Sequence, residues 1–316
     1  MKIQNLNNIV NEALVFFAKN YPEKLNLKNL NFPLVIGSGN AYNTGQILFS
    51  DQSALFANES NLKEIIKNYG ELFKKKIIKD AVIISASGAK DSVWEIKAAK
   101  KLKLKTLLLT CEATSPAAKI ADKVIVYDKL PEPYSYNVST YLGMILSHSG
   151  ENPKKIINFI KNIQPDKNFK KYSSYAFILP DEYLTIGRII LAKTDEIFGG
   201  HIGVRAFSAG DARHAKFINR DRKELVISLG VDNKFFGSPE SRLNIDLPKY
   251  SGPALMFCLV YALLGKIQEL KPPYFKNNIK KYCQDYGPQA YGQNNPFHVI
   301  VPGNLWNIKS LPNNFS

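Results

Sequence analysis

Hydroxyl and glycine residues follow directly after an apolar run in residues 81–92, AVIISASGAKDS. The β-branched run predicts a buried strand, and the residues after it have the pattern of an amphipathic helix. Where a strand passes into a helix, unpaired amides and the positive end of the helix dipole converge and attract anions. Ser85 and Ser87 would add hydroxyl donors, and Lys90 a positive charge. The predicted ligand is the phosphate of a small metabolite.

The same residue types also suit an ordinary turn. Residues 85–88 have the composition of a strand-to-helix turn with a capping residue. The segment itself is compatible with a phosphate site and with an ordinary turn. The elements expected around it distinguish the two interpretations.

Strand-like apolar runs alternate with segments of helical period through the first half of the chain. The runs are residues 33–37, 54–58, 81–85, 106–110 and 123–127, and the helices between them include 61–76 and 92–104. Such alternation predicts a parallel sheet covered by helices on both faces.

A second series of the same kind begins near residue 173. Its expected strands are 175–180, 204–209, 224–230 and 243–248, and its expected helices are 183–198 and 253–270. We therefore expect an α/β protein with two tandem units, each a flavodoxin/Rossmann-like three-layer sandwich. The expected parts are an N-terminal helix at 1–30, units at 31–150 and 173–270, a linker at 151–172, and an irregular C-terminal arm at 271–316.

Two loops are expected at the carboxyl ends of strands in the first unit, where open parallel sheets bind ligands. One is Ser85 to Ser92, and the other is residues 37–45, GSGNAYNTG. This second loop begins with GxG but has Tyr42 where a dinucleotide-binding motif needs its third glycine. NAD is therefore disfavoured, and no cofactor is expected.

The composition is that of a globular protein, with 45% of the 316 residues hydrophobic and 22% charged. Residues 1–17 predict an amphipathic helix rather than a signal peptide, and the apolar stretch 252–267 is too short for a membrane span. Three cysteines without CxxC spacing suggest neither disulfides nor structural zinc, so we expect a cytoplasmic location. The net charge of +15 comes from dispersed lysines without a nucleic-acid motif, and it favours an anionic ligand.

Four motifs follow one another along the chain: GSGNAYNTG, SASGAKDS, a helix with NVSTY at 137–141, and AFSAGDARHA at 206–215. Their order resembles that of the sugar isomerase (SIS) family, and the last motif resembles AxAGExKHG in the isomerase part of glucosamine-6-phosphate synthase. The resemblance covers most of residues 30–270, as two tandem SIS-type domains. It implies a phosphosugar-binding protein, often an aldose-ketose isomerase, that works as a homodimer.

The resemblance also implies a set of phosphate-binding residues. By motif position these are Ser85, Ser87 and the backbone of Gly88 and Ala89, with Gly39, Asn40 and Ser139 or Thr140 nearby. For Ser139 and Thr140, a helix start or a packed helix face is the alternative interpretation.

Three positions depart from the family pattern. Ala41, Ala86 and Lys90 stand where the family has serine, glutamine and threonine. Two contacts to the ligand would be missing, and one cation has been added. Lys90 either compensates as a point charge to the phosphate or is an exposed lysine at the start of a helix.

Aldose-ketose isomerisation needs a base that moves a proton between C1 and C2, and a group that opens the sugar ring. A carboxylate suits the first task and an imidazole the second. Glu196, near the position of the family's catalytic glutamate, and His214 are the candidates, with Asp195 as the rival base. For Glu196, a solvated carboxylate at a helix end is the alternative. Asp211 would orient His214 or cap the helix.

Related isomerases also use a lysine of the C-terminal segment to stabilise the open-chain sugar, and Lys276 or Lys280 stands near that position. The carboxylates and histidines show no spacing typical of metal ligands, so no metal is expected.

The leading hypothesis is a cytoplasmic, cofactor-independent phosphosugar isomerase of the phosphoglucose or phosphomannose type, without a nucleic-acid or membrane partner. A deglycase that acts on a phosphorylated sugar-amine adduct would use a similar site. A non-catalytic phosphosugar-binding or sensor protein is the alternative from another class, and Ala41, Ala86 and Lys90 favour it.

Overall fold

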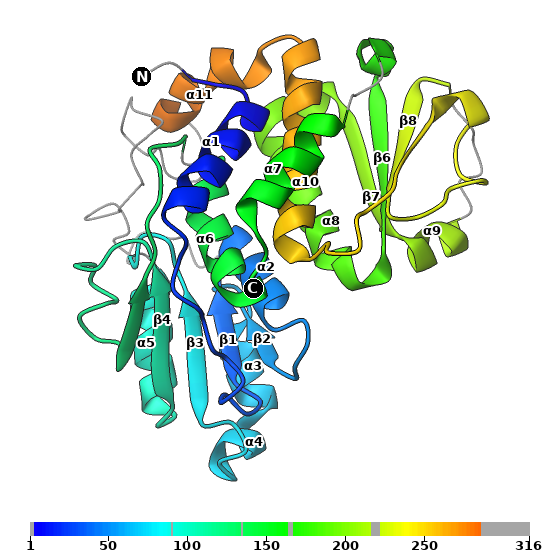
Figure 1. Ribbon diagram of the computed structural model, residues 1–316. Coiled ribbons are helices and arrows are strands. Elements are labelled where there is room, and N and C mark those ends of the chain that lie inside the picture. The colour runs from blue at the N-terminus through cyan, green and yellow to red at the C-terminus, as the bar shows by residue number, and fades with distance from the viewer. Residues whose placement is uncertain (1–2, 90, 134, 164–166, 216–221, 286–316) are drawn as a thin grey trace.

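The computed structural model describes residues 3–89, 91–133, 135–163, 167–215 and 222–285. Within these ranges nine strands form two parallel sheets, with helices around and between them (Figure 1). The first sheet has the order β2-β1-β3-β4-β5, with strands Leu34–Gly37 (β1), Leu55–Ala57 (β2), Asp80–Ile84 (β3), Lys105–Thr110 (β4) and Lys123–Val126 (β5). The second has the order β7-β6-β8-β9, with strands Ser174–Leu179 (β6), Gly203–Ser208 (β7), Glu224–Leu229 (β8) and Arg242–Ile245 (β9). The predicted α/β class with two sheets is confirmed.

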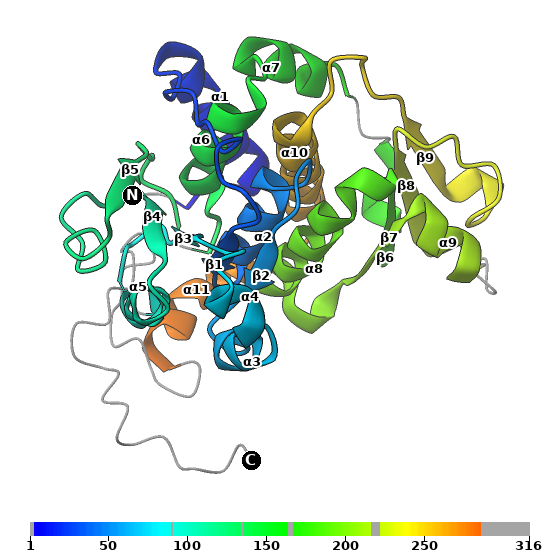
Figure 2. The same cartoon turned by 90° about the horizontal axis from the view of Figure 1, so that it is seen from below.

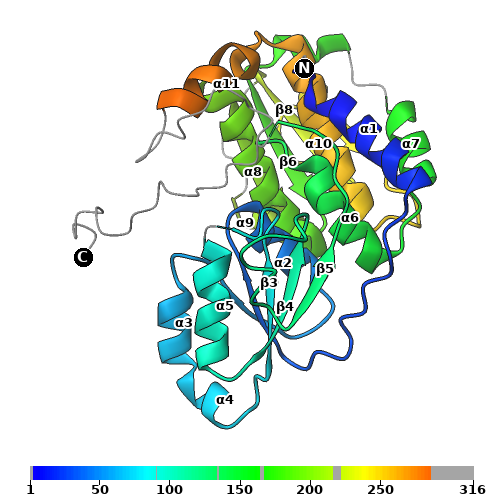
Figure 3. The same ribbon diagram turned by 90° about the vertical axis from the view of Figure 1, so that its left-hand side faces the viewer.

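Alternate residues of the first sheet face two different layers of helices, as the pleat of a strand requires. Ile36, Ile83 and Leu108 pack against α3 (Leu62–Asn68), α4 (Gly70–Lys74) and α5 (Asp91–Lys101). Val35 and Ile84 face the opposite layer, which contains α2 (Asn40–Leu48) and α6 (Val138–Ser149). Figure 3 shows α3 and α5 together on one side of this sheet.

The second sheet is also covered on both faces. Ala176, Ile178 and Val226 pack with Ala212 of the short helix α9 (Ala209–Ala215). The other face turns its apolar residues toward α8 (Leu184–Phe198) and α10 (Pro253–Leu270). Figure 2 shows that α8 and α10 lie between the two sheets and that α9 lies on the outer side.

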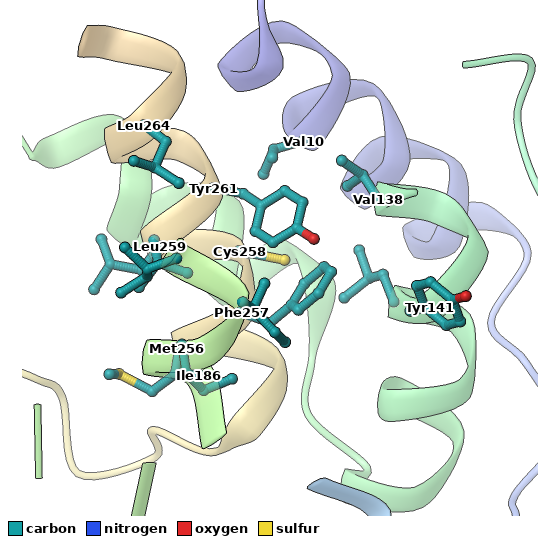
Figure 4. Close-up of a cluster of buried hydrophobic side chains, with 14 of the residues drawn as sticks. Val10, Val138, Tyr141, Ile186, Met256, Phe257, Cys258, Leu259, Tyr261 and Leu264 are labelled. Atoms are coloured by element: carbon teal, nitrogen blue, oxygen red, sulfur yellow. The ribbon is translucent and has the colours of Figure 1, made fainter. Parts of the chain in front are cut away.

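Helix α10 forms the centre of the molecule. It packs against α6, α8 and α1 (Leu6–Lys19), and Phe257 and Tyr261 point toward these neighbours (Figure 4). By length and composition alone α10 could cross a membrane, but 78% of it is buried inside the molecule. A helix that is buried on all sides is apolar on all sides, so its place in the core explains its composition.

One carboxylate joins the two halves of the chain. Glu151 follows the end of α6, and its side chain accepts hydrogen bonds from the amides of Gly252 (2.9 Å), Ala254 (2.6 Å) and Leu255 (2.9 Å) at the start of α10. These amides have no partner within the helix, and a negative charge is favourable at this end of it.

The structure differs from the sequence-based expectation in three connections. The predicted loop 37–45 is short, because α2 begins at Asn40. The predicted linker 151–172 contains α7 (Pro153–Asn162), which packs against α1 and buries Ile156. The predicted irregular arm begins with helix α11 (Tyr274–Asp285), and residues 286–316 lie outside the described part of the chain.

Candidate functional site

A cavity of about 200 Å³ lies at the carboxyl edge of the first sheet, between the ends of β1 and β3. From β1 the chain continues to β2 on one side of this point, and from β3 it continues to β4 on the other side. The connections therefore diverge here, and open parallel sheets bind ligands at such a point. We call it the switch-point cavity. Its lining includes Ser38 after β1, Ser85 and Ser87 after β3, Glu95 of α5, Lys129, and Thr140 of α6.

The loop after β3 has a fixed shape. The amide of Ser85 donates to the carbonyl of Leu109 (3.0 Å), and the amide of Cys111 donates to the carbonyl of Ala86 (3.0 Å). Gly88 has φ +55°, and a Cβ at this position would lie 2.0 Å from the Oγ atom of Ser115. Only glycine fits there, and the loop holds the Ser85 and Ser87 side chains at the cavity.

The predicted backbone contacts of this loop are less available than its side chains. The amide of Gly88 donates to the carbonyl of Ser85 (3.1 Å), and Gly88 is not among the lining residues, although Ala89 is. Lys90 lies outside the described residues. Helix α5 starts at the cavity, which Asp91 and Ser92 line.

Glu95 lines the same cavity from the second turn of α5, and sequence reasoning missed it. Its side chain is 1% exposed, and its Oε1 atom is buried without a hydrogen-bond partner among the described residues. Burial, together with a smaller effect of the nearby carboxylates of Asp91 and Glu59, raises the pKa of Glu95 to about 8. The signal in the sequence was its spacing, since Glu95 falls on the same helix face as the buried Ser92 and Ala99.

Other lining residues were also missed, and Lys129 is the most informative of them. It follows β5, is half-buried, and brings a positive charge to the cavity. Asn137 lies at the start of α6 in the left-handed conformation (φ 51°), which asparagine tolerates better than most residues. Both residues belong to the segment between β5 and α6, whose path the sequence pattern did not predict.

The hydroxyls of Ser139 and Thr140 are bound to a residue of their own chain. Glu132 Oε1 accepts from the Oγ of Ser139 (2.8 Å), the amide of Thr140 (3.1 Å) and the Oγ1 of Thr140 (3.2 Å). Glu132 is buried, and burial raises its pKa although these hydrogen bonds act in the opposite direction. The Oγ of Ser139 also accepts a hydrogen bond from the amide of Leu130 (2.9 Å), and Ser139 is fully buried and does not line the cavity. The alternative interpretation, a packed residue at a helix start, therefore fits Ser139.

The first loop contributes a different residue from those predicted. Ser38 and Ala41 line the cavity, whereas Gly39 and Asn40 do not. Gly39 precedes α2 with φ +55°, and Asn40 is the first residue of that helix. Ser38 therefore supplies a hydroxyl in the loop where Ala41 lacks one.

Glu196 lines a second hollow of about 290 Å³, at the end of α8, together with Ser135, His201 and Phe275. We call it the α8 hollow. The fully buried amine of Lys193 donates to both Glu196 Oε2 and the carbonyl of Ser135. Asp195 lines the α8 hollow too. Ser135 belongs to this hollow whereas Asn137, two residues further on, lines the switch-point cavity, so the two spaces are neighbours.

His214 does not meet Glu196 within one chain. Glu196 lies before the start of β7, whereas His214 lies after the end of β7, exposed on α9 (Figure 1). Asp211, which would orient His214, is exposed on the same short helix. Lys276 is half-buried on α11, and the side chain of Lys280 lies outside the described part of the structure.

Comparison with solved structures shows what the fold is similar to. Glucosamine-6-phosphate deaminase from Thermotoga maritima aligns with a TM-score of 0.53 and 18% identity over 84% of this chain and 92% of its own. Tagatose-6-phosphate ketose/aldose isomerase from Escherichia coli aligns with a TM-score of 0.53 and 11% identity, over 85% and 90%. The C-terminal domain of glucosamine-fructose-6-phosphate aminotransferase from Francisella tularensis gives 0.52 and 11%, over 86% and 94%. The chain has the tandem SIS fold.

No family model and no curated protein matches the sequence. In this tandem SIS fold the second sheet repeats the topology of the first, with β6 and β8 in the places of β1 and β3. Its switch point is packed with side chains, because a Cβ on Gly230 would lie 2.6 Å from Leu247 Cδ1 and 3.4 Å from Pro180 Cγ. Among the described residues, we therefore take the first switch point, where the cavity lies, as the candidate ligand site.

Proposed function

We propose that this protein binds a phosphorylated sugar, with the phosphate in the switch-point cavity, and interconverts its aldose and ketose forms. The observation that carries the proposal is the cavity itself. It lies where open parallel sheets bind ligands, at the start of α5, and its lining includes the hydroxyls of Ser38, Ser85 and Ser87 and the cation Lys129.

The structural neighbours support the ligand class. All three are named for reactions of a sugar 6-phosphate, on a fold that covers most of this chain. Hydroxyl donors with one lysine are a usual environment for a phosphate dianion, because hydrogen bonds to a charged acceptor are the strong ones. The sequence identities of the three structural neighbours with this chain are low. The phosphoglucose or phosphomannose type is therefore proposed from the sequence motifs.

Glu196 is the proposed base. Isomerisation moves a proton between C1 and C2, and the carboxylate would accept it from one carbon and return it to the other. The phosphate end and the reacting end of an open-chain sugar lie several bonds apart. The α8 hollow next to the switch-point cavity offers a place for the reacting end.

His214 is the proposed ring opener, and it requires a second copy of the chain. Glu196 and His214 lie at opposite ends of β7, so one chain does not assemble both groups. In a symmetric homodimer the same surface of each copy meets the other, and His214 of one chain would serve the site of its partner.

A coupled assay with fructose-6-phosphate tests the proposal. Glu196→Gln and His214→Ala should each abolish turnover, and Ser85→Ala should weaken binding. Mixing the Glu196 and His214 variants should restore about one quarter of the wild-type activity, because half of the random dimers carry one intact site. Turnover that survives in both single variants would reject the assigned roles.

A non-catalytic phosphosugar-binding protein is the second candidate. The observation that favours it is the pairing of Glu196 with the buried Lys193, which holds the carboxylate away from the switch-point cavity. Thermal shifts with sugar phosphates but no turnover would support this candidate, since a ligand of the native state raises the melting temperature.

A further inference from the structure

Glu95 is a residue for which the fold itself gives no explanation. Its carboxyl group lies at the wall of the switch-point cavity, 1% exposed, and its Oε1 atom has no hydrogen-bond partner among the described residues. A buried polar atom without a partner destabilises the folded protein, so such groups are rare. A ligand in the cavity would supply the missing partner.

The charges around Glu95 determine whether its carboxyl group can contact an anion in the ionised or in the protonated form. Asp91 of α5 and Glu59, in the loop before α3, are the carboxylates that act on it. Lys129 and Tyr141 line the cavity from the other side, and Lys90 lies outside the described residues. An ionised Glu95 would add a second carboxylate to Asp91 at the wall of a cavity proposed to hold a dianion, and like charges repel.

We propose that Glu95 binds the ligand as a neutral carboxylic acid, whose hydroxyl donates a hydrogen bond to a phosphoryl oxygen. The inference rests on the proposed function, because it takes the phosphate to lie in this cavity. An ionised carboxylate is an acceptor only, whereas the protonated group has one donor. The protonated carboxyl group of Glu95 then donates a hydrogen bond to the phosphate, as the hydroxyls of Ser85 and Ser87 would.

The acid form is available near neutral pH, because burial and the neighbouring carboxylates raise the pKa of Glu95 to about 8. Above that value the free protein must take up a proton before it can bind, and the apparent affinity falls with the protonated fraction. A sugar phosphate is already a dianion above about pH 7, since its second pKa is about 6. The ligand therefore adds no pH dependence of its own between pH 7 and pH 9.

The experiment is a calorimetric titration of the whole protein with fructose-6-phosphate between pH 6.5 and pH 9. For the wild type we expect the affinity to fall about tenfold from pH 7 to pH 9, following the protonated fraction of Glu95. Glu95→Gln keeps a donor that never ionises, so its affinity should stay constant over this range. Asp91→Asn removes a neighbouring negative charge and should move the midpoint of the wild-type profile to lower pH.

The outcomes separate the inference from the proposed function. If the wild type binds but Glu95→Gln shows the same pH profile, or if affinity rises with pH, the inference is wrong and the proposed function stands. If the wild type binds no sugar phosphate at any pH while it is folded, both are wrong. Should Glu95→Gln not fold, infrared difference spectra of the wild type decide, because ligand binding must shift the carbonyl band of a protonated carboxyl group.

Discussion

The four strands of the second sheet repeat the topology of β1 to β4 in the first, but the two switch points differ. In the first sheet the loops after β1 and β3 carry Ser38, Ser85 and Ser87 and leave a cavity between them. In the second sheet the corresponding loops after β6 and β8 begin with Pro180 and Gly230, and Leu247 packs against the glycine. Topology thus offers two equivalent positions for a ligand, and the loop residues leave one of them open.

The difference shows how a repeated fold can divide its tasks. Apolar packing at the second switch point adds to the stability of the protein, whereas the first has serine hydroxyls at a cavity and the Oε1 atom of Glu95, which has no hydrogen-bond partner among the described residues. The first sheet is therefore expected to respond to ligand and pH, and the second is expected not to.

The largest effect should come from the two glycines. Gly88→Ala forces an alanine into φ +55° and places its Cβ 2.0 Å from Ser115 Oγ, so the loop must move. We expect phosphate binding to weaken by about 3 kcal/mol, the upper range for backbone strain of this kind. Gly230→Ala, at φ +67°, meets the movable tip of Leu247 and should lower stability without changing binding. Calorimetry and urea unfolding of both variants measure this, and equal losses of binding would contradict the comparison.

The next largest effect is expected for the pH dependence of the free energy of unfolding, through the protonation of Glu95. The folded pKa of Glu95, about 8, lies above the ordinary value near 4.3, so between these values only the folded state holds this proton. The free energy of unfolding should therefore fall as pH rises through this window, by at most about 1.4 kcal/mol per pH unit, and be fully retained below it. Urea unfolding at several pH values should show that Glu95→Gln lacks this component. Parallel curves for the variant and the wild type would exclude it.

A smaller effect is expected for the loop hydroxyls. Ser85→Ala and Ser87→Ala each remove one donor from the lining of the cavity, and each should weaken the binding of fructose-6-phosphate by about 1 kcal/mol, or about fivefold. Titration calorimetry measures the change. Unfolding transitions identical to that of the wild type would confirm that the loss concerns the ligand alone, and unchanged affinity would remove these serines from the site.

The smallest effect is expected in the second sheet. Ser228 of β8 is fully buried, and its Oγ has no hydrogen-bond partner among the described residues. Ser228→Ala removes this unpaired hydroxyl, so we expect the free energy of unfolding to stay the same or to rise by less than about 1 kcal/mol. Binding of fructose-6-phosphate should not change. A clear loss of stability in thermal unfolding would show that the hydroxyl has a structural partner.

Strand positions could be predicted well where a strand is a short apolar run buried on both faces, as β1 and β3 are. The run 81–85 became Asp80–Ile84, and the run 33–37 became Leu34–Gly37. The segment 37–45 was interpreted as a loop that follows the strand 33–37. Gly45 instead lets α2 approach the sheet, since a Cβ there would lie 2.8 Å from Val35 Cγ1. A single sequence does not distinguish a glycine that breaks a helix from one that packs it.

The candidate site could be predicted only in part. The loop after β3 was found because its residues are adjacent in the sequence, and Ser85 and Ser87 do line the cavity. Glu95 and Lys129 come from other elements, and only the tertiary structure brings them there. The surroundings of Ser139 could not be predicted for a related reason, since Glu132, seven residues earlier, folds back onto the start of α6 and accepts a hydrogen bond from the Ser139 hydroxyl.

The contact of Glu151 with the start of α10 has a mechanical consequence. The three hydrogen bonds that Glu151 accepts from backbone amides join residues about 100 positions apart in the chain. They connect the end of the first unit to the central helix of the second. A hinge rotation that separated the two units would have to break all three hydrogen bonds at once, and hydrogen bonds to a charged acceptor are the strong ones. We expect the amides of Ala254 and Leu255 to exchange their hydrogens only on global unfolding. We therefore expect the two units to stay together when a ligand enters the switch-point cavity.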